Sequence, residues 1–330
     1  MKVLISDHPD SMMPDHTLET ETLKEGLGPD VQVEIYPYDQ DKKEEFYRRL
    51  ADADALLTAF VTIDAEVMGH ASRLKVISLN STGYDQVDLE EATRRGIGVC
   101  PVGEYCTQDV SESAIAYMFA LNKHFKEYQQ DIEERHLWDY AAVPPWPRME
   151  DQVLGIVGFG KIGKCTARKA SGLVKRVIAC DPFVDDEAFE KLGVERVDKE
   201  ALFAQADIVA NHMNLTDENV HFFNAAAFDA MAARRPLFIN LGRGLCVDEP
   251  ALVEALDDGK LRAFGTDVLY DEVPDLATSK LVGRENVIIT PHAAFYSTTA
   301  LEDLERLSCQ NIVYFLTGQR EKVFKLVNNV

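Results

Sequence analysis

The sequence VLGIVGFGKIG, residues Val153–Gly163, decides the fold of this chain. Its first five residues predict a buried strand, which runs directly into the turn Gly158-x-Gly160-x-x-Gly163 and then into a helix. Glycines at this spacing let the chain turn tightly and let a pyrophosphate approach the backbone, while the helix offers its N-terminus to the phosphates. The stretch predicts a dinucleotide site, and an ordinary glycine turn between a strand and a helix is the less favoured interpretation.

An acidic residue ends the next predicted strand. Asp181 follows the apolar segment Val177–Cys180 and lies 18 residues after Gly163. A carboxylate in this position can accept hydrogen bonds from a ribose hydroxyl. It would also repel the additional phosphate of NADP, and no arginine follows it directly, since the next residues are Pro182, Phe183 and Val184. The pattern therefore predicts NAD as the cofactor.

Composition limits the classes of protein. A chain of 330 residues is too long for a single small core, so two domains are expected. The net charge of −22 disfavours nucleic acid and anionic membranes as partners, because the mean field repels phosphate. The sequence has no transmembrane run, and its start, MKVLISD, lacks the apolar core of a signal peptide and predicts a buried strand.

The cysteines indicate a reducing compartment. They show no C-x-x-C spacing, and several lie in apolar segments. The six are Cys100, Cys106, Cys165, Cys180, Cys246 and Cys309. This pattern predicts reduced structural thiols in a cytoplasmic protein, without a metal site or a disulfide framework.

Short apolar strands alternate with helical patterns in the N-terminal part of the chain. The predicted strands are Lys2–Ser6, Val31–Tyr36, Ala55–Leu57, Lys75–Leu79 and one that ends near Val99, and the predicted helices are Leu18–Leu27 and Lys42–Ala51. This order predicts a parallel, doubly wound sheet. A long buried helix is then predicted from Asp109 to Phe125, followed by a charged helix over Asp131–Trp138 and an ordered, proline-rich connection over Ala141–Arg148.

A second series of strands begins at the glycine turn. The predicted strands are Val153–Val157, Val177–Cys180, Ile208–His212, Leu237–Asn240, Ala263–Thr266 and Val287–Thr290. Six strands after one glycine turn match a complete dinucleotide-binding domain. A helix from Thr298 to about Leu316 then returns toward the first domain. We therefore expect a nucleotide-binding domain, residues 104–298, inserted into a domain formed by residues 1–103 and 299–330.

Polar residues follow the strands of the second series, where an open α/β sheet places its ligands. Arg243 can clamp a carboxylate and its neighbouring carbonyl with a planar fork. His292 can exchange a proton with that oxygen, and Glu272 can hold the imidazole in one tautomer and favour its protonated form. Asp267 and His212-Met213 end further strands. Taken alone, each of these residues has an ordinary alternative, such as a surface ion pair, a loop carboxylate, a helix cap or a turn; together they favour a catalytic site.

These residues and their spacing resemble the NAD-dependent D-isomer-specific 2-hydroxyacid dehydrogenases. The segments that carry the resemblance are STGYDQVDL (81–89), GIVGFGKIG (155–163), INLGRGLCVDEPAL (239–252), GTDVLYDEVP (265–274) and NVIITPHAAFYS (286–297). The resemblance implies two doubly wound parallel-sheet α/β domains, with a Rossmann NAD-binding domain inserted into a flavodoxin-like substrate domain. It also implies a small 2-oxo or 2-hydroxy acid substrate and a homodimer paired through a dimerisation arm of the NAD-binding domain.

The resemblance implies roles for single residues. Arg243 corresponds to the arginine that binds the substrate, His292 to the proton donor and Glu272 to the acid that assists it. Ser81, Thr82 and Gly83 correspond to the loop that holds the substrate carboxylate. Cofactor contacts are implied for Thr82, Gly158, Gly160, Lys161, Ile162, Gly163, Asp181, His212, Met213, Leu241, Gly242, Asp267, Ala293, Ala294 and Phe295. Of these, Asp267 matches the aspartate near the nicotinamide amide.

Departures from the family pattern leave alternatives open. Asn214 stands where the family often has proline, and with HAAFYS (292–297) it leans toward the C-terminal-binding protein branch, so an NAD-sensing scaffold is one alternative. Phe295 and Tyr296 also resemble the D-lactate dehydrogenase branch. Phe295 either walls the substrate pocket, which would favour an apolar or aromatic 2-oxo acid, or belongs to the core. A 3-phosphoglycerate or hydroxypyruvate dehydrogenase is a further alternative, although the loop at Ser81 has no basic residue nearby for a phosphate.

Overall fold

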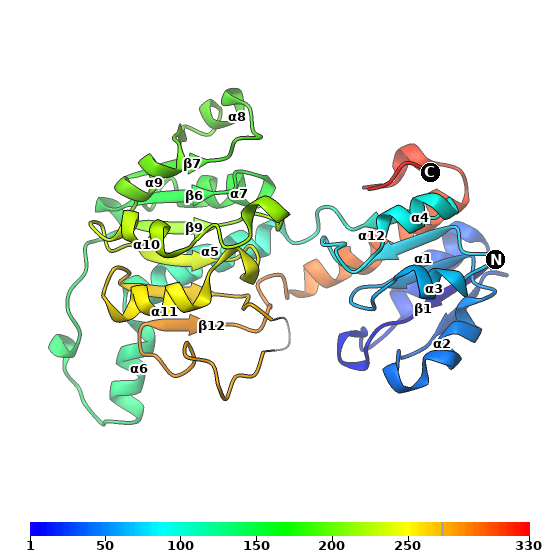
Figure 1. Ribbon diagram of the computed structural model, residues 1–330, viewed down its shortest axis with the longest axis horizontal. Coiled ribbons are helices and arrows are strands. Elements are labelled where there is room, and N and C mark those ends of the chain that lie inside the picture. The colour runs from blue at the N-terminus through cyan, green and yellow to red at the C-terminus, as the bar shows by residue number, and fades with distance from the viewer. Residues whose placement is uncertain (272–273) are drawn as a thin grey trace. The chain divides into compact units, whose positions relative to one another are not determined.

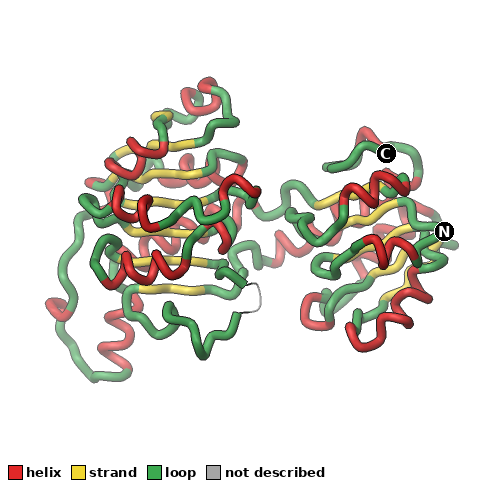
Figure 2. The backbone as a smooth tube through the Cα atoms, in the orientation of Figure 1, coloured by secondary structure: helices red, strands yellow, loops and turns green. Residues whose placement is uncertain are grey.

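The computed structural model describes residues 1–271 and 274–330. Within that part, the chain forms two compact units, one made of Met1–Tyr105 with Ser297–Val330 and the other of Cys106–Tyr296. Each unit is a parallel sheet with helices on its two faces (Figures 1 and 2). None of the helices in these ranges is long and apolar enough to cross a membrane.

The first unit contains a five-stranded parallel sheet in the order β2-β1-β3-β4-β5. The strands are β1 (Lys2–Ile5), β2 (Gln32–Ile35), β3 (Ala55–Thr58), β4 (Val76–Leu79) and β5 (Gly98–Pro101). The helices are α1 (Thr17–Leu27), α2 (Lys43–Leu50), α3 (Ala65–Gly69), α4 (Leu89–Arg95) and α12 (Thr298–Leu316). Strands β3, β4 and β5 are buried at every position, as expected for parallel strands that are covered on both faces. The late helix α12 packs against α1 and β4, which joins the C-terminal segment to this sheet.

The second unit contains a seven-stranded parallel sheet in the order β12-β11-β10-β9-β6-β7-β8. Its strands are β6 (Val153–Val157), β7 (Arg176–Cys180), β8 (Glu195–Arg196), β9 (Ile208–Asn211), β10 (Leu237–Asn240), β11 (Ala263–Thr266) and β12 (Val287–Ile289). Its helices are α5 (Thr107–Asn122), α6 (Phe125–Glu133), α7 (Lys161–Ala170), α8 (Asp186–Glu190), α9 (Lys199–Gln205), α10 (Ala225–Met231) and α11 (Glu249–Asp257). The chain leaves β6 toward β7 and β8, then returns to β9 on the other side of β6. This reversal is the point at which doubly wound sheets bind their ligands.

The two parallel-sheet α/β domains and the Rossmann topology confirm the predicted fold class. The six strands predicted for the second series match β6, β7, β9, β10, β11 and β12 to within one residue at either end. The sequence interpretation missed β8, because its two residues are exposed and carry no apolar signal.

The prediction of the helices before β6 was wrong in its boundaries. The buried helix α5 ends at Asn122, and the next helix covers Phe125–Glu133 in place of Asp131–Trp138. The break lies at His124, whose φ of 55° is in the left-handed region and ends the helical path. Nothing in the periodicity of the sequence marks this position, since the polar and apolar pattern continues through it.

Candidate active site

The glycine turn after β6 fits a pyrophosphate. Gly158 has a φ of 88°, and a Cβ there would lie 2.7 Å from the backbone nitrogen of Met213. A Cβ on Gly163 would lie 2.2 Å from the carbonyl oxygen of Gly158, so this position also requires glycine. Gly160 is the N-cap of α7, and a Cβ there would meet nothing within 4 Å. The first N–H groups of a helix have no intrahelical partner and can bind an anion, and Lys161 is exposed in this first turn.

Asp181 links the glycine turn to the end of β7. Its Oδ2 accepts a hydrogen bond from the backbone N–H of Phe159 at 2.8 Å, and its Oδ1 accepts one from Phe183 at 2.9 Å. Each carboxylate oxygen has a second lone pair, so these bonds leave acceptors for ribose hydroxyls. Arg196 of β8 donates to the Asp181 carbonyl oxygen at 3.3 Å. The sequence interpretation looked for a basic residue directly after Asp181 and did not find this one, because β8 brings it from a distance of 15 residues.

His212 follows β9 and is held as a neutral imidazole. Its Nε2 lies 3.1 Å from Oγ1 of Thr166 on α7. Its Nδ1 is buried and has no hydrogen-bond partner among the described residues. Burial lowers the pKa of His212 to about 4, so the ring carries no charge at neutral pH. The ring therefore packs beside the glycine turn and forms a hydrogen bond there, and it is not suited to act as a proton donor.

Two buried asparagines join the carboxyl ends of β9 and β10. Asn211 Nδ2 donates to Asn240 Oδ1 at 2.9 Å, and Asn211 Oδ1 accepts from the Met213 amide at 3.0 Å. Asn240 Oδ1 also accepts from the Gly242 amide at 3.2 Å, and its Nδ2 donates to the Arg243 carbonyl at 3.1 Å. The two side chains fix both loops. In the sequence, Asn240 stands out only as part of a motif and Asn211 not at all, because an amide at a strand end carries no distinctive pattern.

Arg243 extends from the loop that Asn240 fixes. Leu241 and Gly242 before it are buried, while the arginine itself is half-buried. Its Nη1 donates to the Gly242 carbonyl at 3.0 Å, which draws the guanidinium back along its own loop. Arginine has five N–H donors, so this bond leaves most of the fork for an anion.

The carboxylate of Asp267, after β11, builds the turn that carries His292. Its Oδ1 accepts the Ala293 amide at 2.8 Å and the hydroxyl of Thr290, and its Oδ2 accepts the Ala294 amide at 2.8 Å. Its carbonyl oxygen accepts the His292 amide at 2.8 Å. Asp267 is 3% exposed. This carboxylate therefore determines the backbone of the turn from within.

His292 itself has a strained backbone. Its φ is 52°, a conformation that costs a residue other than glycine of order 1–3 kcal/mol unless the surroundings impose it. The half-buried imidazole lies with its ring centre 6.5 Å from that of Phe295, edge to face. Phe295 and Ala294 pack against the buried core of the second unit. Strained residues of this kind gather at functional sites.

Helix α5 supports the same turn from the core. The hydroxyl of Tyr117 donates to the Thr266 carbonyl at 2.8 Å and lies 2.6 Å from Thr290 Oγ1. Burial raises the pKa of Tyr117, so the hydroxyl stays protonated. Ser113, one turn earlier, donates to the Ala294 carbonyl at 3.3 Å. The sequence predicted only that this helix is buried, since a tyrosine in an apolar helix is as typical of packing as of hydrogen bonding.

Apart from Ile162 in the first turn of α7, the remaining predicted residues lie in the first unit or outside the described residues. Ser81, Thr82 and Gly83 follow β4, where Ser81 Oγ donates to the Gly83 carbonyl at 2.7 Å and the Ser81 carbonyl accepts the Val102 amide at 3.0 Å. Thr82 at the tip of this closed turn is exposed. Glu272 lies outside the described residues, so its predicted role stays a prediction.

Known proteins are similar to this chain in sequence. A family model described as "D-isomer specific 2-hydroxyacid dehydrogenase, NAD binding domain" matches residues 115–294. Glyoxylate reductase from Korarchaeum cryptofilum (strain OPF8) is 32% identical over 281 residues, which are 84% of this chain and 84% of that protein. D-3-phosphoglycerate dehydrogenase from Archaeoglobus fulgidus is 31% identical over 277 residues, which are 84% of this chain and 52% of that longer protein.

A solved structure agrees with these relatives. D-lactate dehydrogenase from Aquifex aeolicus, in complex with NAD and lactic acid, superposes with a TM-score of 0.86 at 25% identity and covers 99% of each chain. The family model describes an NAD-binding domain, and the solved relative holds NAD. Both therefore support NAD as the cofactor, as do the glycine turn and Asp181. The chain belongs to the family of NAD-dependent D-isomer-specific 2-hydroxyacid dehydrogenases.

Proposed function

We propose that this enzyme interconverts a small 2-oxo acid and the D-2-hydroxy acid, with Arg243 binding the substrate and His292 transferring the proton. The observation that carries the proposal is the turn around His292, in which a buried carboxylate and a core tyrosine impose a strained histidine. NAD supplies or accepts the hydride, and the protein binds, orients and polarises the substrate. The relatives named as dehydrogenases and reductases of 2-oxo acids support the same reaction class.

Arg243 is proposed to bind the carboxylate and the neighbouring carbonyl oxygen of the substrate. The planar guanidinium matches two oxygen atoms at once, which fixes the orientation of the carbonyl. A positive charge beside that oxygen also stabilises the alkoxide character that develops during reduction. The loop is suited to this task because Asn240 and Asn211 hold it through three hydrogen bonds of 2.9 to 3.2 Å.

His292 is proposed to donate a proton to the carbonyl oxygen in reduction and to remove it in oxidation. A histidine suits both directions, since its ordinary pKa lies near neutrality. Glu272 is proposed to orient the imidazole and to favour its charged form. Asp267 does not take that place in our account, because its carboxylate is engaged by the backbone amides of Ala293 and Ala294.

The substrate is proposed to be an unphosphorylated 2-oxo acid. The Ser81–Gly83 turn is proposed to bind the carboxylate through its backbone, and a phosphate would need basic side chains that this segment does not carry. Phe295 is proposed to wall the pocket beside the substrate side chain, which favours apolar substituents. Glyoxylate, pyruvate and phenylpyruvate are therefore expected to react better than hydroxypyruvate or 3-phosphohydroxypyruvate.

Two variants and a substrate panel test this function. NADH oxidation is followed with each of the five acids, and the best one is used for Arg243→Ala and His292→Ala. Both variants are expected to lose at least about a thousandfold in kcat/KM while NADH binding, measured by fluorescence, persists. Wild-type rates in either variant would exclude the assigned role. Tight NADH binding with no turnover of any acid by the wild type would instead favour the scaffold function.

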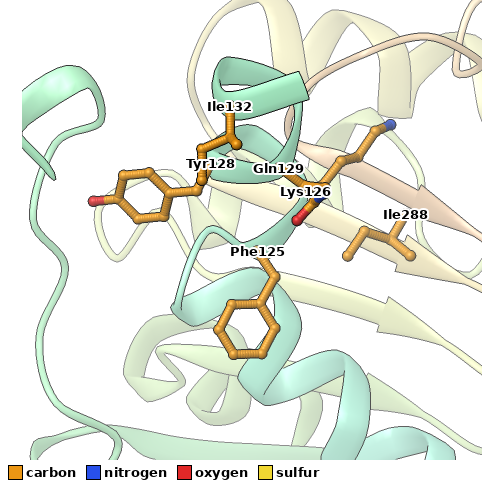
Figure 3. Close-up of a pocket in the computed structure, with 6 residues that line it drawn as sticks. All are labelled: Phe125, Lys126, Tyr128, Gln129, Ile132 and Ile288. Carbon is orange, nitrogen blue, oxygen red and sulfur yellow. The ribbon is translucent and has the colours of Figure 1, made fainter. Parts of the chain in front are cut away.

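We also propose a homodimer formed through the segment around α6. In Figure 3, an apolar pocket is lined by Ile288 of β12 and by five residues of α6, namely Phe125, Lys126, Tyr128, Gln129 and Ile132. Trp138 and Tyr140, just beyond this helix, are 91% and 89% exposed. A surface this apolar is expected to be covered in solution, and the family resemblance favours a second copy. Light scattering should give a dimer for the wild type and a monomer for Trp138→Glu, whereas Phe60→Ser on the first unit should remain dimeric.

The location is proposed to be the cytoplasm. All six cysteines are free thiols, and four of them are buried. This pattern agrees with a compartment in which thiols remain reduced.

A further inference from the structure

A buried carboxylate lies beneath the segment that follows β4. Glu19 on α1 is 0% exposed, although glutamate is almost never fully buried without partners. One of its oxygens contacts Nδ1 of His16, and the other accepts a hydrogen bond from Asn80 Nδ2 at 3.4 Å. The reaction assigned above uses neither Glu19 nor His16.

Asn80 connects this carboxylate to the substrate turn. It lies between the end of β4 and Ser81, and its backbone N–H donates to the Thr58 carbonyl at 2.8 Å. Its Oδ1 is buried and has no hydrogen-bond partner among the described residues. The hydrogen bond that Asn80 Nδ2 donates to Glu19 therefore orients the amide, because no described residue bonds to its Oδ1.

Neighbouring helix α12 makes the arrangement rigid. The hydroxyl of Ser78, two residues before Asn80, donates to the Ser308 carbonyl at 2.8 Å. Glu305, one turn earlier on α12, is close enough to Glu19 for the two charges to interact. The carboxylate of Glu19 thus lies between two helices and the strand that leads into the substrate turn.

We propose that Glu19 is a positioning residue for the Ser81–Gly83 turn and acts through Asn80. The inference rests on the proposed function, in which that turn binds the substrate carboxylate. A fixed carboxylate holds the Asn80 amide, and this amide sets where the following backbone N–H groups lie. Glu19 therefore governs the affinity for the 2-oxo acid, while the cofactor residues and the proton donor belong to the second unit.

A contribution to stability alone does not explain why a glutamate is buried at position 19. A buried ion pair commonly contributes no more than well-packed apolar side chains of the same volume, because both charges lose their hydration. A purely structural glutamate would therefore affect unfolding without a selective effect on substrate binding. This difference separates the two roles experimentally.

The experiment compares Glu19→Gln with Glu21→Gln, an exposed glutamate on the same helix. KM and kcat are measured with pyruvate, or with the best acid of the panel, together with NADH affinity and thermal stability. Glu19→Gln is expected to raise KM roughly tenfold with kcat within about twofold and NADH affinity unchanged. A KM equal to that of Glu21→Gln in a folded protein would overturn the proposal.

A second variant tests the route through Asn80. Asn80→Ala is expected to raise KM by a similar factor, and the double variant should be no worse than either single one, because coupled residues are not additive. If the double variant raised KM by the product of the two single effects, the route through Asn80 would be overturned. An unchanged KM in Asn80→Ala would also overturn it, even if Glu19→Gln failed to fold. If the wild type turned over no 2-oxo acid at all, the proposed function itself would fail and this inference with it.

Discussion

The carbonyl oxygen of Asp267 accepts the backbone amide of His292 at 2.8 Å, while the carboxylate of the same residue accepts the two amides that follow. One side chain and one peptide therefore hold three consecutive backbone groups. This explains how His292 keeps a φ of 52° without glycine. The strain is imposed by a buried acid on the neighbouring strand, so the position of the imidazole depends on that acid.

Removing this carboxylate should misplace His292. Asp267→Ala leaves the amides of Ala293 and Ala294 without their acceptor, and the turn should relax toward an ordinary conformation. We expect kcat with the best 2-oxo acid to fall by about a hundredfold, since a shift of about 1 Å at a reacting group has that effect. Steady-state kinetics check it against Glu254→Ala, an exposed acid on α11. A kcat equal to that of the control would show that the turn holds without Asp267.

Tyr117 should stabilise the same turn from α5. Tyr117→Phe removes only the hydroxyl that contacts Thr266 and Thr290, and leaves a buried carbonyl with one bond fewer. We expect a loss of about 1–3 kcal/mol in the free energy of unfolding. Urea unfolding measures it, with Tyr296→Phe as the matched control because that residue is 70% exposed. Equal midpoints for the two variants would contradict the role of the buried bonds.

Glu305 should make stability fall as pH rises. Burial, followed by the charge of Glu19, raises its pKa from 4.5 to about 7, with His16 opposing and Asp15 and Glu302 adding to the shift. The folded protein thus holds a proton that the unfolded chain releases, so stability decreases between about pH 4.5 and 7. Glu305→Gln has no carboxyl group to titrate at this position, so its stability should not show this decrease.

Thermal unfolding at two pH values measures the effect. Relative to wild type, Glu305→Gln should gain stability at pH 8 and little at pH 5. Glu302→Gln, an exposed neighbour on α12, should show no such difference between the two conditions. An equal change at both pH values for Glu305→Gln would contradict the raised pKa.

Cofactor choice should depend on Asp181 and Arg196 together. Asp181→Ser removes the charge that repels a 2′-phosphate, while Arg196 remains beside it on β8. We expect kcat/KM for NADPH to rise roughly tenfold and that for NADH to fall by a similar factor. Adding Arg196→Ala should cancel the gain with NADPH but leave the loss with NADH. A gain that survived without Arg196 would assign the discrimination to Asp181 alone.

The sequence sufficed for those parts of the fold that depend on local pattern. Buried parallel strands such as β6 and β9 are continuous apolar runs, and the turn at Gly158 can be built only without a side chain. The break at His124 and the edge strand β8 could not be predicted. The first depends on a left-handed backbone conformation at His124 that the residue pattern does not mark, and the second on pairing of two exposed residues with β7.

The site shows the same contrast between residues marked by local sequence pattern and residues defined by distant contacts. Arg243 and His292 could be predicted as site residues because polar residues at successive strand ends are unusual and their spacing matches a family. Asn211, Tyr117 and Glu19 were not found, since each is an ordinary residue in sequence and gains its significance from partners 29 to 173 residues away. Such contacts arise only when the strands and helices have assembled.

A crystal structure with NADH and a non-reactive 2-oxo acid analogue, such as oxamate, shows directly whether His292 can transfer the proton. We expect a ring nitrogen of His292 about 2.6–3.2 Å from the oxygen that takes the place of the reacting carbonyl, with the Arg243 guanidinium on the carboxylate. A bound analogue with the His292 ring directed away from it, and beyond reach even through one water, would exclude His292 as the proton donor.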